Sequence, residues 1–311
     1  MLSTRCASRV GQLFLLLLAG QLLTAQRSVN VLRTAYLPEH TAGSREVGLR
    51  EAETFTFERN LIFFEALVNG QPGNFILDTG APTLVVNNRG EVTHGSNYEG
   101  FGSGGSVELS DHRVDAFQMG GLSIENYWAI GLDLRSMETR VGQRIDGMVG
   151  YDLLNDGELR IDYAQRSFRL LPSERRPVHD GAQPRAVLRF SLVDHLPVVR
   201  LRINGKRYDF AIDTGAGSNL VDEHVARELQ LTGTGEGMNI QGLDGRPVEA
   251  DLVTLPAPTE FADGREDVHL VTMDLSHLGD NGQRLAGILG SAFLSQYTVG
   301  IDYRRRRIYL W

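Results

Sequence analysis

The chain has 311 residues, of which 41% are hydrophobic and 23% are charged. This composition is typical of globular proteins and argues against long disorder or a fibrous repeat, and the length allows one large domain or two moderate ones. The formal net charge of −8 at pH 7 is a poor electrostatic match for a phosphate backbone, so no nucleic-acid partner is expected.

Residues 1–25 have the features of a secretory signal peptide. Arg5 and Arg9 supply a positive region, and the apolar run that follows is too short for a comfortable membrane span. Cleavage after this segment would give an exported chain, periplasmic or secreted, with no stable membrane span; an uncleaved segment that acts as a membrane anchor is the alternative. The single cysteine, Cys6, would be removed with it.

Two stretches of the chain repeat each other in the same order. Residues 68–81 and 203–216 align without a gap at an offset of 135, and they share Asn-Gly, a Phe and Asp-Thr-Gly-Ala. Two further blocks recur at an offset of 140: residues 147–150 with 287–290, and residues 161–163 with 301–303. Ordered blocks of this kind in both halves indicate a duplicated fold.

The duplication defines two lobes, residues 55–171 and 186–311, joined by a linker at residues 172–185 that contains proline and glycine. Residues 26–54 form an N-terminal extension, which is polar and weakly periodic. The extension could add a strand, act as a prosegment or remain a loose extension.

Each lobe is predicted to be mainly β with few short helices. Asn69-Gly70 and Asn204-Gly205 are hairpin signals between apolar runs. The best helix signal covers residues 222–229, with Asp222 as its N-cap, and residues 151–154 and 291–294 are expected to form short helical turns.

The repeated Asp-Thr-Gly motif supplies two candidate catalytic carboxyl groups. A strand that ends in aspartate presents its carboxylate from a rigid base, and the glycine beside it permits a close approach of the backbone. Pseudo-twofold symmetry would bring Asp78 and Asp213 together at the lobe interface. Because two close carboxylates cannot both ionise, they would share one proton. One would act as a general base on water, and the other would polarise a carbonyl group.

These motifs resemble those of aspartic proteases of the retropepsin/pepsin type. The chain looks like a single-chain bacterial member of that family. The signature in each lobe is an apolar pair before Asp-Thr-Gly-Ala, followed downstream by an apolar-apolar-Gly block. The resemblance covers residues 55–311. It implies two acid-protease β-barrel lobes related by a pseudo-twofold axis, with an active-site cleft between them. It also implies an aspartic endopeptidase that acts on an extended polypeptide and needs no cofactor.

The resemblance assigns roles to matching residues. Asp78 and Asp213 would be the catalytic pair, and Thr79 and Thr214 would form a reciprocal grip between the two loops. The remaining assignments are loop support from Gly80, Ala81, Gly215 and Ala216, and bracing of the loops from beneath by Val149, Gly150, Leu289 and Gly290.

Ala81 and Ala216 stand where pepsin-like enzymes usually carry Ser or Thr. An alanine side chain cannot donate a hydrogen bond to the ionised carboxylate, which should leave the pKa of that carboxylate higher. We therefore expect a pH optimum that is mildly acidic to near neutral.

Glycine-rich segments at matching places in the two halves are candidate flaps. Hairpin tips of this kind suit lids that close over an extended peptide. The candidate glycines are Gly102, Gly104, Gly105, Gly242 and Gly245. The first segment also matches G-x-G-x-x-G, but the residues after it are predicted to form a strand and not the helix that a dinucleotide site needs.

Two functions are compatible with these motifs: an aspartic endopeptidase, or a catalytically silent peptide-binding module on the same fold. They differ in whether the carboxylates of Asp78 and Asp213 lie within reach of one water. Since both motifs are on one chain, we expect a monomer. The eight histidines lack His-x-x-x-His spacing, and no metal site is predicted.

Overall fold

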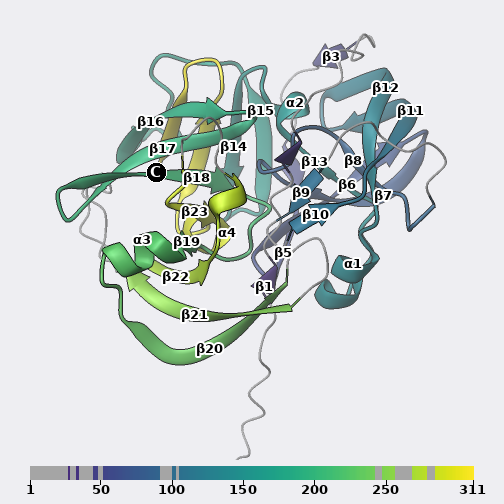
Figure 1. The fold of residues 1–311 in the computed structure, drawn as a ribbon. Helices are drawn as coiled ribbons and strands as arrows, with labels where there is room; N and C mark the ends of the chain where they lie inside the picture. Colours follow the sequence, from purple (N-terminus) through teal and green to yellow (C-terminus); the bar gives the residue numbers. More distant parts are fainter. Residues whose placement is uncertain are drawn as a thin grey trace, which may run out of the picture.

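A computed structural model describes residues 27–28, 33–34, 45–47, 52–91, 100–102, 105–241, 247–255, 268–278 and 284–311. The predicted signal peptide lies outside the described residues, as do Gly104, Gly242 and Gly245. The predicted fold class is confirmed, because the described chain is mainly β with short helices (Figure 1). No helix in these ranges is both long and apolar enough to cross a membrane.

The first lobe is built on a closed ring of six strands. They run in the order β11-β12-β8-β13-β7-β6, and β11 pairs back onto β6. Their bounds are β6 (Leu61–Val68), β7 (Gln71–Leu77), β8 (Val85–Asn87), β11 (Ser110–Met119), β12 (Leu122–Leu132) and β13 (Gly147–Val149). Outside the ring, β5 (Thr56–Glu58) pairs with β6, and β9 (Gly100–Gly102) forms a hairpin with β10 (Gly105–Val107).

The second lobe repeats these connections. β18 pairs in parallel with β23 as β7 does with β13, and β19 lies between β23 and β22 as β8 lies between β13 and β12. The strands are β16 (Ala186–Val193), β17 (Leu196–Ile203), β18 (Lys206–Asp213), β19 (Leu220–Asp222), β20 (Gly233–Gln241), β21 (Pro247–Leu255), β22 (Val268–Met273) and β23 (Gly287–Gly290). The duplication inferred from the sequence is therefore a duplication of topology.

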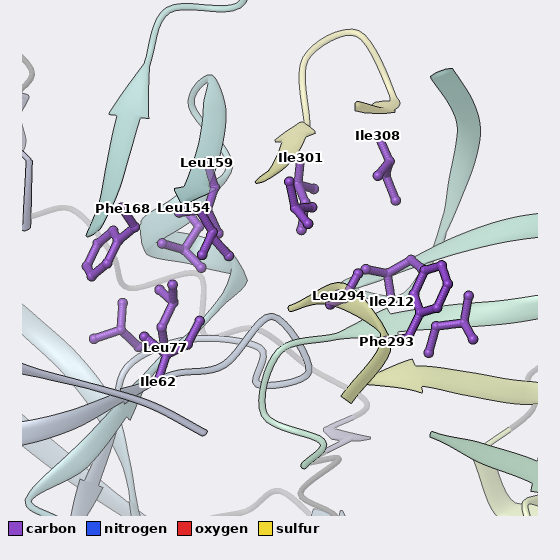
Figure 2. Close-up of a cluster of buried hydrophobic side chains, with 14 of the residues drawn as sticks. Ile62, Leu77, Leu154, Leu159, Phe168, Ile212, Phe293, Leu294, Ile301 and Ile308 are labelled. Atoms are coloured by element: carbon purple, nitrogen blue, oxygen red, sulfur yellow. The ribbon is translucent and has the colours of Figure 1, made fainter. Parts of the chain in front are cut away.

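One sheet joins the two lobes. The hairpin of β14 (Glu158–Asp162) and β15 (Ser167–Leu171) belongs to the first lobe, and that of β24 (Thr298–Asp302) and β25 (Arg307–Leu310) to the second. β14 and β24 pair antiparallel, and β4 (Glu53–Thr54) and β16 extend the sheet at either side. The hydrophobic core is continuous across this junction, and Figure 2 shows side chains from both lobes in it, including Leu77, Phe168, Ile212 and Ile301.

The predicted hairpin turns are present. Asn69 and Gly70 connect β6 to β7, and Asn204 and Gly205 connect β17 to β18. All four residues have positive φ, between 49° and 80°, as the tight turns favoured between twisted antiparallel strands require.

Three of the helices were predicted and one was missed. The turns α2 (Tyr151–Leu154) and α4 (Ser291–Leu294) cover the predicted residues. The helix α3 (Glu223–Glu228) follows Asp222, whose carboxylate accepts from two backbone N–H groups of the helix. The missed helix, α1 (Arg135–Val141), buries Met137 and Val141. A 3₁₀ turn, η1 (Ser276–Leu278), follows β22 in the second lobe.

The N-terminal extension contributes strands. β1 (Arg27–Ser28) pairs in parallel with β20 at Ile240 and Gln241, and β2 (Arg33–Thr34) pairs antiparallel with β9. β3 (Arg45–Val47) pairs with β12. Of the three possibilities for residues 26–54, added strands are observed, and β1 and β2 lie along the strands that lead into the two candidate flaps.

Candidate active site

Each Asp-Thr-Gly begins where a central strand of its lobe ends. Asp78 directly follows β7, and its N–H donates to the carbonyl of Val149 at 3.0 Å. Asp213 is the last residue of β18 and pairs in register with Gly290 of β23. Both aspartates are fully buried, so their carboxyl groups lie away from bulk solvent.

The two threonines lock the loops together. The Thr214 N–H donates to the Thr79 hydroxyl oxygen at 3.0 Å, and the Thr79 N–H donates to the Thr214 hydroxyl oxygen at the same distance. Each hydroxyl in turn donates across the interface, Thr79 to the carbonyl of Ile212 and Thr214 to that of Leu77, at 3.2 and 2.8 Å. The two loops therefore hold each other through four hydrogen bonds that cross the lobe interface.

The glycines of the two motifs bring the carboxyl groups together. The Gly80 N–H donates to Oδ1 of Asp78, and the Gly215 N–H donates to Oδ1 of Asp213, both at 2.8 Å. A Cβ on Gly80 would lie 2.5 Å from the Asp213 carboxylate, and a Cβ on Gly215 would lie 2.2 Å from the Asp78 carboxylate. Each carboxylate therefore occupies space that only a glycine in the opposite loop can leave open.

The apolar-Gly blocks lie against the backs of the two loops. A Cβ on Gly150 would lie 2.3 Å from the carbonyl oxygen of Ala81, and one on Gly290 would lie 2.3 Å from that of Ala216. The same two carbonyls accept from the N–H of the next residue in each block, Tyr151 and Ser291. Val149 and Leu289 pair with Leu77 and Ile212, the residues before the two aspartates.

Burial and the closeness of the two carboxyl groups shift the pKa values of Asp78 and Asp213. Burial raises the pKa of Asp78 well above its usual value, and the negative charge of Asp213 raises it further. Burial also raises the pKa of Asp213, to about 7, although the N–H groups of Gly215 and Ala216 and the contact with Asp78 lower it. Within the described residues, Oδ2 of Asp78 and Oδ2 of Asp213 have no hydrogen-bond partner. The pair can thus retain a proton at near-neutral pH and present two oxygens to a ligand.

A buried hydroxyl network that sequence reasoning missed lies behind the Asp213 loop. The Ser291 hydroxyl donates to the carbonyl of Thr214 at 3.0 Å, and the hydroxyl of Tyr163 lies 3.2 Å from Ser291 Oγ. Tyr303, the equivalent of Tyr163 in the repeat, has a buried hydroxyl that lacks a partner among the described residues. The repeat itself carried the signal, since Tyr163 and Tyr303 both end the block Ile-Asp-Tyr.

Two hairpin tips also reach the Asp-Thr-Gly loop of the opposite lobe. His195, between β16 and β17, places Nε2 2.8 Å from the carbonyl oxygen of Gly80. Asn60, between β5 and β6, donates through Nδ2 to the carbonyl of Gly217 at 2.9 Å. These residues occupy equivalent positions at the repeat offset of 135, which is the signal that would have found them.

The first candidate flap is partly described. Gly102 ends β9 and pairs with Gly105, which begins β10. A strand therefore follows this glycine-rich segment, as predicted, and the dinucleotide alternative is not supported. The other flap glycines fall outside the described residues.

Comparison with known proteins identifies a family. The model of a family described as aspartyl protease matches residues 64–153 and 199–293, one segment in each lobe. No curated protein matches the sequence significantly. The crystal structure of the aspartic proteinase from Irpex lacteus is similar, with a TM-score of 0.46 and 12% identity, over 84% of this chain and 96% of that one.

Proposed function

Since the chain belongs to the aspartyl protease family, we propose that it is an aspartic endopeptidase whose catalytic pair is Asp78 and Asp213. The observation that carries this proposal is the direct apposition of the two buried carboxyl groups. Gly80 and Gly215 leave room for them, and the reciprocal threonine bonds fix the two loops relative to each other.

The proposed reaction uses one proton held by the pair. The ionised carboxylate removes a proton from a water molecule while the water oxygen attacks the carbonyl carbon of the peptide bond. The protonated partner gives its proton to the carbonyl oxygen, which forms a neutral tetrahedral diol. Collapse of the diol breaks the C–N bond, and a proton passes to the leaving nitrogen, so that a carboxylic acid and an amine are released and the pair holds one proton again.

The proposal is tested by cleavage of an unfolded protein substrate between pH 3 and pH 8. Asp78→Asn and Asp213→Asn should each abolish cleavage, because either change removes a group that must change protonation state. Asp115→Asn is the matched control, since the side chain of Asp115 is 77% exposed and lies outside the site. A folded wild-type chain that binds peptides without cleaving them at any pH would instead identify a peptide-binding module.

We further propose that the chain is exported and acts as a monomer on extended polypeptides. The proposal of a monomer is supported by the grip between Thr79 and Thr214, which is made within one chain. Light scattering on the fraction that carries peptidase activity tests it, and activity confined to a dimer would refute it. Export rests on residues 1–25, and N-terminal sequencing of the protein recovered from the periplasm or medium tests it.

A further inference from the structure

Each aspartate accepts a hydrogen bond from a backbone N–H of its own loop. The two aspartates differ in the side chains that lie behind that peptide group. Gly215 N–H, which donates to Asp213 Oδ1 at 2.8 Å, belongs to the same peptide group as the carbonyl of Thr214. That carbonyl accepts from Ser291 Oγ at 3.0 Å. Because the serine proton is committed to the carbonyl, the Tyr163 hydroxyl must donate to Ser291 Oγ. A continuous chain of donors thus runs from Tyr163 through Ser291 and one peptide group to the Asp213 carboxylate.

The first lobe does not repeat this arrangement. The residue equivalent to Ser291 is Tyr151, and the residue equivalent to Tyr163 is Tyr303. The rings of Tyr151 and Tyr303 pack edge to face with their centroids 5.5 Å apart. The hydroxyl of Tyr303 is buried without a partner among the described residues, so the chain of donors has no counterpart on the Asp78 side.

We propose that Ser291, oriented by Tyr163, is a positioning residue that makes Asp213 the ionised general base and leaves the shared proton on Asp78. A hydrogen bond to the carbonyl of a peptide polarises that peptide and strengthens the bond that its N–H donates, and the effect is largest in a buried site. The polarised Gly215 N–H favours the ionised form of Asp213. This role rests on the proposed peptidase function and deepens it, because it assigns base and acid within the pair.

The other titratable groups that face Asp213 do not oppose this assignment. Asp78 faces it from the first lobe, and contact between the two carboxyl groups raises the pKa of Asp78 while it lowers that of Asp213. Burial raises the pKa of Tyr163 and of Tyr303 far above neutrality, so both stay uncharged over the working range of pH. His195 contacts the opposite loop at the carbonyl of Gly80.

The test compares Ser291→Ala and Tyr163→Phe with Tyr303→Phe. The first two interrupt the donor chain, and the third removes an equivalent hydroxyl that is not part of it. We expect Ser291→Ala to shift the acidic limb of the kcat profile upward by about half a pH unit, and Tyr163→Phe to shift it in the same direction by less. KM should stay unchanged, since the Ser291 hydroxyl lies behind the Asp213 loop and bonds to the carbonyl of Thr214. Tyr303→Phe should leave the acidic limb of the kcat profile at the pH of the wild type.

A second measurement separates this proposal from the proposed function. Carbon-13 labelling of the aspartate carboxyl groups allows their titration to be followed by NMR whether or not the chain cleaves peptides, with Asp213→Asn assigning the signal. Asp213 should ionise before Asp78 in the wild type, and at higher pH in Ser291→Ala. A wild type that does not cleave but titrates in this order would refute the peptidase and retain the donor chain. If the Asp213 carboxyl titrates at the same pH in Ser291→Ala, Tyr163→Phe and Tyr303→Phe, the proposal is overturned.

Discussion

Replacement of a buried carboxyl group should make the fold more stable at neutral pH. The pKa of Asp213 is raised from 3.8 to about 7, a change of about three units, which corresponds to about 4 kcal/mol of stability. Because the folded protein holds this proton more tightly than the unfolded chain, the contribution is fully present below about pH 4. It is lost as the pH rises through about 7. Asp213→Asn keeps the size of the side chain and an acceptor for Gly215 but cannot ionise.

Urea unfolding at pH 4, 6 and 8 measures this effect. Asp213→Asn should match the wild type within about 1 kcal/mol at pH 4 and should exceed it by about 2–4 kcal/mol at pH 8. The exposed control Asp115→Asn should follow the wild type at every pH. If the wild type loses no more stability than Asp213→Asn between pH 4 and pH 8, the Asp213 carboxyl is not buried in the manner described, and the argument fails.

Three further changes probe the geometry of the site. Thr79→Val removes the hydroxyl from the reciprocal grip and should lower the free energy of unfolding by about 1–3 kcal/mol in urea, whereas Thr79→Ser should retain most of it. Gly80→Ala places a Cβ 2.5 Å from the Asp213 carboxylate and should abolish cleavage, while Gly233→Ala, whose nearest neighbours lie at 4.0 Å, should leave kcat/KM unchanged. A chain without residues 1–51 should have a lower KM for an extended peptide, because β1 and β2 pair with strands of the two flap regions. An unchanged KM would show that the extension does not compete with substrate.

The positions that could be predicted from the sequence are those that only one residue type can fill. Gly80 and Gly215 stand two residues after Asp78 and Asp213 because a Cβ at either position would collide with the carboxylate of the opposite loop. Gly150 and Gly290 recur because a side chain would strike the carbonyl of the loop in front of them. Such positions keep the same residue in both halves after a duplication. The two halves can therefore be aligned from the sequence, and the alignment predicts that the two loops pair.

The residues that were missed act through contacts between the lobes. Tyr163 and Ser291 are 128 positions apart, and His195 and Gly80 are 115 apart, so no local periodicity links the partners. The helix α1 was missed for another reason. Its buried residues Met137 and Val141, with Leu134 before them, have helical spacing, but the segment is short and has no side-chain N-cap.

The shared sheet bears on how far the two lobes can be treated as separate units. The boundaries at residues 171 and 186 follow composition, yet β14 before the linker pairs along its whole length with β24 after it. The threonine bonds and the hydrophobic core also cross between the lobes. Neither half can present a complete site or bury its own interface alone, and the loops that carry the aspartates are held together by threonine bonds that cross that interface. A change that loosens the lobes should therefore disturb the protonation of the pair before the barrels themselves unfold.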